Sequence, residues 1–359
     1  MNISIKGAYG ESNFGDDLLM VVFEDYINSN IQTKQLNFIG EENDYVYKFL
    51  VNSSYNNKHK NEMLIYGGGT QFFAFIEKYT IKAKLKSLIS NSPIELITKL
   101  FSKFRSAKQK VEGEKVFLGF GLGPFHGNTK AINFAKSQLK NSFFIGVRDE
   151  KSFEYCSDWN LNAILGADVV FSSYFQKFLK TPDPLEVKDN IGIIVRDWDW
   201  DNNKVDYQNR IITFVDSNPQ LDVTYIVFSK DKDSKWIEKI SNKKHIIWEP
   251  EKMKIKDFLL VLNSFSTFIT ARYHGAIIAG LLGKKVICIE IEPKLKILTK
   301  QIPTFALWNN EFNTDELGEI LNSKLACTHE DYIIKLRSKA DEMLNLFVEK
   351  YKSKFLSNK

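Results

Sequence analysis

An arginine and a histidine stand together where the most apolar part of the chain passes from strand to helix. The strand predicted over Thr267–Ala271 is followed directly by Arg272, and His274 comes two positions later. A helix of small and apolar residues is predicted to begin near Gly275, and its free backbone N–H groups would attract an anion. Arg272 would add a planar fork for phosphate or carboxylate, and His274 a proton donor. The alternative is an ordinary turn with an arginine–carboxylate pair and a capping histidine.

Cationic side chains follow other predicted strands as well. Lys294 lies in the loop after the strand Val286–Ile291, and Arg148 and Arg196 each come directly after a strand. In open α/β sheets, ligands bind beyond the carboxyl ends of the strands. We therefore expect an anion-binding role for Arg148 and Lys294 and a place at the cleft for Arg196. A solvated lysine and a local Arg148–Asp149 pair are the alternatives.

Glycine-rich turns end the strands of the N-terminal half. Asn13 and Asp16 belong to the first turn, where they would bind a polar ligand or merely cap the next helix. Gly68 and Gly69 would let a ligand or a neighbouring loop approach the backbone closely. His126 follows a third turn at the same predicted edge, although a single histidine is more often structural. No GxGxxG, Walker A, Gly-x-Ser-x-Gly or zinc signature is present.

The elements that would position these residues alternate between strand and helix, which is typical of doubly wound parallel sheets. The predicted strands share an apolar run closed by a glycine or a polar turn: Ile3–Lys6, Met63–Tyr66, Val116–Phe120, Phe143–Val147, Ile191–Val195, Val223–Phe228, Thr267–Ala271 and Val286–Ile291. A proline- and charge-rich stretch over 180–190 separates the first four from the last four. We therefore predict domains over 1–179 and 190–328. A helix over 329–359 follows, with an apolar stripe that runs from Ile333 to Tyr351.

Composition excludes several classes of protein. The chain has 359 residues, of which 43% are hydrophobic and 26% charged, with a formal net charge of +5. This mixture excludes a disordered chain or a collagen-like repeat, and the length suits two domains. The weak charge does not predict a nucleic-acid partner. No apolar run approaches the roughly 20 residues that span a bilayer.

The cysteines and histidines argue against a metal site. Cys156, Cys288 and Cys327 are odd in number and widely spaced, which indicates reduced thiols rather than a disulfide framework. No cluster of histidines, cysteines and carboxylates has metal-ligand spacing, so no metal is expected. The N-terminus is typical of a strand rather than of a signal peptide, so we expect a cytoplasmic protein.

One long basic segment, Lys78–Lys115, interrupts the alternation. Apolar residues lie on one helical face of it, and lysines and Arg105 lie around or beyond that face. A surface helix with a solvated face is the simpler interpretation. The alternative is a helix that contacts anionic lipid headgroups at the inner face of the cytoplasmic membrane.

Several motifs carry a family resemblance and occur in order along the chain: Asn13-Phe14-Gly15-Asp16-Asp17, Gly67-Gly68-Gly69-Thr70, Gly119-Phe120-Gly121-Leu122-Gly123-Pro124, Val147-Arg148-Asp149, Gly166-Ala167-Asp168, Thr270-Ala271-Arg272-Tyr273-His274 and Pro293-Lys294. Together they resemble the polysaccharide pyruvyl transferases. The Arg-x-His motif with its small-residue helix is the most specific of them. The resemblance implies two Rossmann-like domains that face a cleft, as in the GT-B fold, and a C-terminal helix that returns to the first domain.

The resemblance also implies a reaction. The enolpyruvyl carbons of phosphoenolpyruvate would move onto two hydroxyls of a sugar, a pyruvate ketal would form, and phosphate would leave. The acceptor would be a cell-surface polysaccharide or its nucleotide-linked or lipid-linked precursor. Phosphoenolpyruvate is a co-substrate here, and no cofactor is implied.

The residues fit this chemistry in separate roles. Arg272, the helix N-terminus at Gly275 and Lys294 would hold one end of phosphoenolpyruvate, and Arg148 of the facing, acceptor-side domain would hold the other. His274 would protonate the methylene carbon as the general acid. His126 would accept a proton from a sugar hydroxyl.

Two other functions compete with this one. The first is a GT-B glycosyltransferase with a nucleotide-sugar donor. The second is a non-catalytic partner in glycan assembly that has kept the fold. In that case the substitutions Arg272→Ala and His274→Ala would leave the glycans of the cell unchanged.

Overall fold

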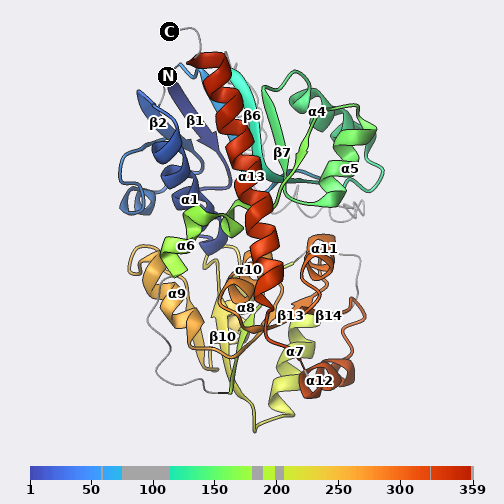
Figure 1. The fold of residues 1–359 in the computed structure, drawn as a ribbon. Helices are drawn as coiled ribbons and strands as arrows, with labels where there is room; N and C mark the ends of the chain where they lie inside the picture. The colour runs from blue at the N-terminus through green and yellow to red at the C-terminus, as the bar shows by residue number, and fades with distance from the viewer. Residues whose placement is uncertain (58–59, 75–112, 180–188, 199–205, 324, 357–359) are drawn as a thin grey trace, which may run out of the picture.

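The structure is a computed structural model that describes residues 1–57, 60–74, 113–179, 189–198, 206–323 and 325–356. Most of the basic segment Lys78–Lys115 and most of the stretch 180–190 therefore lie outside the described residues. The described chain forms two parallel sheets covered by helices, one above the other (Figure 1). The prediction of doubly wound parallel sheets is confirmed.

The first sheet has the strand order β3-β2-β1-β4-β6-β7-β8, with β5 paired beside β6. Its strands are β1 Asn2–Lys6, β2 Gln35–Ile39, β3 Ser54–Tyr55, β4 Met63–Gly67, β5 Thr70–Phe72, β6 Glu114–Leu122, β7 Phe144–Val147 and β8 Ile164–Leu165. The helical segments between them are α1 Phe14–Asn30, η1 Asp44–Lys48, α4 Thr129–Leu139, α5 Glu150–Asp158, η2 Val169–Phe171 and α6 Ser173–Leu179. Every strand pair in this sheet is parallel, so the carboxyl ends of the strands meet at one edge.

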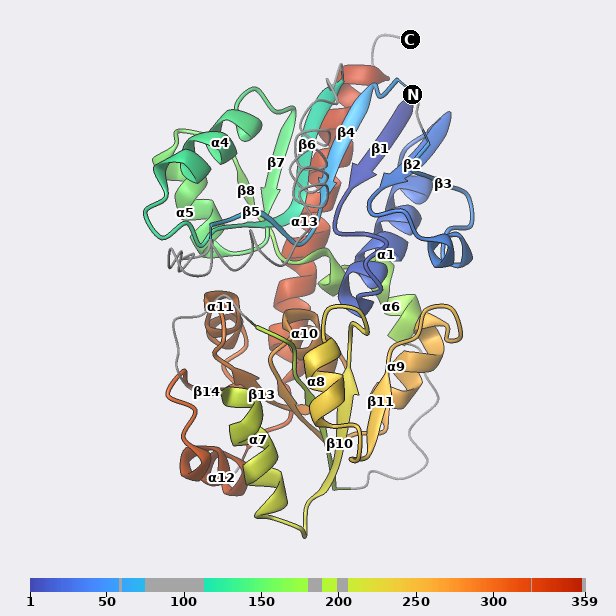
Figure 2. The same ribbon diagram turned by 180° about the vertical axis from the view of Figure 1, so that it is seen from behind.

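The second sheet has the order β11-β10-β9-β12-β13-β14. Its strands are β9 Asn190–Ile194, β10 Asp222–Val227, β11 His245–Ile247, β12 Thr267–Thr270, β13 Lys285–Ile289 and β14 Ala306–Trp308. The helices are α7 Tyr207–Asp216, α8 Ser234–Lys239, α9 Ile255–Asn263, α10 Tyr273–Leu281, α11 Pro293–Gln301 and α12 Thr314–Asn322. Seen from behind, α8, α10 and α11 face the first domain across the gap between the two sheets (Figure 2).

The C-terminal helix α13, Glu330–Phe355, runs from the second domain back over the first, as predicted (Figure 1). Its predicted apolar stripe, from Ile333 to Tyr351, is buried. Met343 of this helix packs so closely on the first sheet that a Cβ at Gly146 or Gly166 would lie within 2.6 Å of its sulfur. The helix therefore ties the two domains together along one side.

A second connection between the domains runs through the start of α1. The backbone N–H of Phe14 donates to the carbonyl of Phe228 at 2.9 Å, just after β10. The Phe14 ring lies 4.6 to 5.1 Å from the rings of Phe228, Trp248 and Phe258, all in the second domain. Edge-to-face aromatic contacts of this kind add to the burial of apolar surface. The loop that carries Asn13 is consequently fixed against both domains.

Candidate active site

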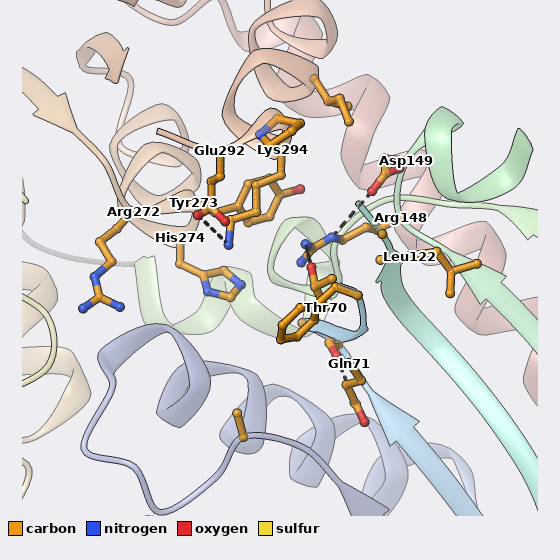
Figure 3. Close-up of a pocket in the computed structure, with 18 of the residues that line it drawn as sticks. Thr70, Gln71, Leu122, Arg148, Asp149, Arg272, Tyr273, His274, Glu292 and Lys294 are labelled. Atoms are coloured by element: carbon orange, nitrogen blue, oxygen red, sulfur yellow. Dashed lines mark hydrogen bonds and ion pairs between the residues drawn. The ribbon is translucent and has the colours of Figure 1, made fainter. Parts of the chain in front are cut away.

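A cavity of about 890 Å³ lies between the two domains, at the facing carboxyl ends of their sheets. Nine of the predicted site residues line it: Asn13, Asp16, Gly68, Gly69, Arg148, Arg196, Arg272, His274 and Lys294. Figure 3 shows Arg148 and Thr70 of the first domain opposite Tyr273, His274 and Lys294 of the second. Residues predicted from their positions at strand ends, in both halves of the chain, therefore lie in one cavity.

His274 lies in the first turn of α10 and points into this cavity (Figure 3). Its ring packs against the backbone of Gly15, where a Cβ would come within 2.3 Å of Nδ1. Its Nε2 lies 3.6 Å from Oδ2 of Asp168 and has no hydrogen-bond partner among the described residues. The imidazole is thus held on both sides by the first domain, although it belongs to the second.

Arg148 is almost fully buried at the end of β7 and is fixed by three contacts. Nη1 donates to Asp168 at 3.0 Å and Nη2 donates to Thr70 Oγ1 at 2.9 Å. The guanidinium carbon stands 4.3 Å from the ring centre of Tyr273, a cation–π contact between the domains. Its Nε has no hydrogen-bond partner in the described part of the chain. The arginine is therefore pre-organised, and Asp149 Oδ2 also lies 3.8 Å from its buried Nε.

Arg272 lines the cavity, but its guanidinium is paired with a carboxylate. It is the N-cap residue of α10 and is only 5% exposed. Its Nη2 is bonded to the buried carboxylate of Asp233, and Figure 3 shows the guanidinium turned away from Arg148 and Lys294. The alternative of an arginine–carboxylate pair is the one that the geometry favours. A buried pair of this kind fixes the turn that carries His274.

Glu292 joins two predicted cations at the N-terminus of α11. Its Oε1 accepts from Arg196 Nη1 at 3.2 Å and from Lys294 Nζ at 2.8 Å. Burial alone would raise the pKa of Glu292, but Lys294 and Arg196 hold it below its ordinary value. Burial lowers the pKa of Lys294, and Glu292 only partly offsets this effect. The Lys294 nitrogen lies 5.8 Å from the ring centre of Tyr273, on which Arg148 also stands.

The glycine-rich turns form the wall of the cavity in the first domain. Asn13 caps α1 by accepting from the N–H of Gly15 at 3.3 Å, and its amide donates to Asp16 at 2.5 Å. Burial raises the pKa of Asp16, although the nearby His274 and Arg272 pull it down. Gly68 and Gly69 have φ of +66° and +67°, and a Cβ at Gly69 would meet nothing within 4 Å. The backbone is therefore open to a ligand at Gly69.

Two predicted residues do not line the cavity. His126 is exposed on the turn before α4, with φ of +45°, so the structure does not support it as a catalytic base. Gly275 is buried inside α10, which begins at Tyr273 rather than near Gly275. A Cβ at Gly275 would lie 2.6 Å from Thr270 Oγ1, so the absence of a side chain lets the helix pack closely on its strand.

Sequence reasoning did not place the buried acids and the aromatic ring that hold the cations. Asp168 follows the two-residue strand β8, and Asp233 lies in the loop after β10. Neither position has a hydrophobic pattern that could mark it, although Asp168 lies within one of the family motifs. Glu292 and Tyr273 adjoin predicted residues, and their positions at strand ends could have identified them as site residues.

Two features are absent from the described residues. No described helix is both long and apolar enough to cross a membrane. Within the same residues, no three histidine, cysteine or acidic side chains are grouped closely enough to hold a metal ion. Cys156 and Cys288 are buried and reduced as expected, whereas Cys327 is exposed and free.

The model of the polysaccharide pyruvyl transferase family matches residues 13–293, a range that contains every residue placed in the cavity above except those of α11 beyond Pro293. The chain belongs to the polysaccharide pyruvyl transferase family. A search of curated proteins found no match to it. The family resemblance drawn from the motifs is thereby confirmed, and the protein is assigned as a transferase of polysaccharide biosynthesis.

Solved structures confirm the fold. The UDP-GlcNAc 2-epimerase of Methanocaldococcus jannaschii, in complex with UDP-GlcNAc and UDP, is 11% identical with a TM-score of 0.59 over 97% of this chain and 99% of that one. The enzyme of Neisseria meningitidis bound to UDP-GlcNAc is 10% identical with a TM-score of 0.59, covering 98% and 100%. That of Rickettsia bellii is 12% identical with a TM-score of 0.56, covering 100% and 99%. These likenesses show a GT-B fold, as predicted.

Proposed function

We propose that this member of the pyruvyl transferase family transfers the enolpyruvyl group of phosphoenolpyruvate onto two hydroxyls of one sugar. The product is a pyruvate ketal, and inorganic phosphate is released. The observation that carries the proposal is the meeting of Arg148 and Lys294, from opposite domains, at the Tyr273 ring and beside His274 in one cavity. A donor with a phosphate and a carboxylate needs two cations at separate points.

The proton transfers balance without a further reactant. His274 gives a proton to the methylene carbon, which becomes the methyl group, and C2 becomes electrophilic. One sugar hydroxyl adds to C2 and loses its proton to the protein. Phosphate then leaves, the second hydroxyl adds to C2 and gives its proton to the phosphate, and the proton taken from the first hydroxyl returns to His274. We assign the base to Asp16, since it lines the cavity with a raised pKa, and no longer to His126.

Most cations of the cavity already have a carboxylate partner, so the donor has to bind beside these pairs. Nη1 and Nη2 of Arg148 each donate one N–H, to Asp168 and Thr70, and their second N–H groups would bind the donor. The first-turn N–H groups of α10 have no side-chain cap, which leaves them available to an anion. No cofactor takes part in the proposed reaction. The acceptor is a sugar residue of a polysaccharide or of its nucleotide-linked or lipid-linked precursor. The reaction takes place in the cytoplasm.

The deciding experiment incubates the protein with phosphoenolpyruvate and a panel of glycan acceptors. Phosphate release that depends on an acceptor, together with a product of the mass of a pyruvate ketal, supports the proposal. No release with any acceptor of a broad panel contradicts it.

A nucleotide-sugar glycosyltransferase is the second candidate, because two of the solved structures of similar fold, from Methanocaldococcus jannaschii and Neisseria meningitidis, hold UDP-GlcNAc. Thermal unfolding separates the two candidates, since a ligand that binds only the folded state raises Tm. A UDP-sugar that raises Tm when phosphoenolpyruvate does not would favour this candidate.

A further inference from the structure

The carboxylate of Asp168 stands between two residues of the proposed site. It lies at the start of η2, and its Oδ1 accepts from the N–H of Val170 at 3.1 Å. Its Oδ2 accepts from Arg148 Nη1 at 3.0 Å and lies 3.6 Å from His274 Nε2. The side chain is fully buried. One fixed oxygen therefore faces the arginine of its own domain and the imidazole of the other.

This carboxylate is charged at neutral pH. Burial alone would raise the pKa of Asp168, but His274, Arg148 and the N–H of Val170 together bring it below its ordinary value. An ionised carboxylate beside an imidazole nitrogen sets the orientation of the ring. A fixed orientation is what a general acid at His274 requires.

The imidazole has little freedom on its other side. Gly15 of α1 touches the ring near Nδ1, and only a glycine leaves room for it there. The separation of 3.6 Å between Nε2 and Asp168 is slightly longer than a hydrogen bond, as catalytic contacts often are without substrate. A small approach of the two domains would complete the bond.

We propose that Asp168 is the positioning residue of the site: it orients His274 across the domain boundary, so that the general acid is complete only when the domains meet. This inference rests on the proposed function. The simpler alternative is that Asp168 only neutralises Arg148. The two differ in whether loss of Asp168 acts through His274.

A double-mutant cycle separates them. Asp168→Asn, His274→Gln and the double variant are compared by kcat and KM for pyruvyl transfer. We expect Asp168→Asn to lower kcat about tenfold or more in the wild-type background. In the His274→Gln background the same change should cost less than about twofold. An equal loss in both backgrounds overturns the proposal. Asp168→Glu, which keeps the charge, should recover part of the lost kcat.

A chemical probe tests the contact even if pyruvyl transfer is never observed. Diethyl pyrocarbonate modifies accessible imidazole nitrogens, so removal of the carboxylate that faces Nε2 should make His274 more reactive toward it. We expect Asp168→Asn to accelerate modification of His274 at neutral pH several-fold relative to the exposed His126 and His329, measured on peptides by mass spectrometry. An unchanged rate overturns the proposal independently of the reaction.

Asp149→Asn is the matched control for this probe. Asp149 also lies near Arg148, with Oδ2 at 3.8 Å from Nε, and its other oxygen caps α5 by accepting from the N–H of Ser152. Its substitution should leave the rate at His274 unchanged. Acceleration in this variant as large as in Asp168→Asn would mean that loosening Arg148 is sufficient, and the proposal would fail.

Discussion

The indole N–H of Trp248 donates to Asp17 Oδ2 at 2.8 Å, across the boundary between the two domains. The other oxygen of Asp17 accepts from the hydroxyl of Tyr45 at 2.6 Å. The carboxylate is fully buried and is paired with neutral donors instead of a cation. Burial raises the pKa of Asp17 to about 7, and Asp16 and Glu251 add to the rise, while Tyr45 and Trp248 oppose it.

The first prediction is that Asp17→Asn stabilises the protein at high pH. Between pH of about 4 and about 7 the folded state holds a proton on Asp17 that the unfolded state has released, so the free energy of unfolding falls as pH rises. Asparagine keeps an acceptor for Trp248 and carries no charge. The difference in unfolding free energy between variant and wild type should therefore grow by about 2 to 3 kcal/mol from pH 5 to pH 8.

Chemical denaturation at several pH values measures this difference. Trp248→Phe is the companion variant, because it removes the donor and leaves the carboxylate buried with one bond fewer. It should destabilise the protein, most strongly above pH 7. Parallel stability curves for wild type and Asp17→Asn would contradict the assignment of a raised pKa to this group.

The second prediction concerns Gly15 and the His274 ring. In Gly15→Ala the new methyl group would lie 2.3 Å from Nδ1 and 2.8 Å from Cγ, so the imidazole has to move. We expect kcat to fall about tenfold or more, because a displaced acid loses its alignment with the substrate. Alanine in a helix would otherwise add about 0.4 to 1 kcal/mol of stability.

Gly318→Ala provides the matched control in α12. A Cβ there would meet only Phe214, at 3.6 Å, which is an ordinary contact. This variant should gain stability of about 0.4 to 1 kcal/mol and keep its activity. Full activity in Gly15→Ala would show that the ring has room to move, and that its fixed position is not needed.

Periodic patterns predicted the parts of the fold that depend on burial along one element. The stripe of α13 was predicted residue by residue because one face of a helix repeats every 3.6 positions. Arg148 was placed at the site because β7 is an uninterrupted apolar run that ends beside it. Because the strands pair in parallel, their carboxyl ends meet at one edge of the sheet, and this places Arg148 at that edge.

Contacts between distant segments could not be predicted in this way. The sequence placed Arg272 at the correct edge, but only the fold shows that its fork turns to Asp233. Asp168 follows a strand too short to carry a pattern, and its partner His274 is more than a hundred positions away. The start of α10 at Tyr273 was missed because the helix was expected to begin at the small residues.

The third prediction is that Lys294→Gln weakens donor binding. Lys294 and Glu292 form a pair beside Tyr273, and loss of the ammonium leaves Glu292 to repel an anionic donor. KM for phosphoenolpyruvate should rise about tenfold. Lys335→Gln, on the exposed face of α13, is the control and should leave KM unchanged. Equal KM values in both variants would remove Lys294 from the donor site.

The pH dependence of donor binding by the wild type provides a second test of Lys294. Because burial lowers the pKa of Lys294, the ammonium loses its proton at a lower pH than an exposed lysine does. Donor affinity should accordingly weaken at moderately alkaline pH, and this decline should be absent in Lys294→Gln. A decline of the same size in both proteins would assign it to another group.

The fourth prediction compares two histidines that the sequence proposed for proton transfer. His274→Gln removes the imidazole that lies in the cavity, so we expect kcat to fall about a hundredfold or more. His126→Gln changes an exposed side chain outside the cavity and should leave kcat unchanged. Tm should fall little in either variant, because neither imidazole has a close hydrogen-bond partner in the described residues that the substitution would remove. If His274→Gln instead unfolds the protein while His126→Gln lowers kcat, His274 is structural and the cavity is not where the proton is transferred.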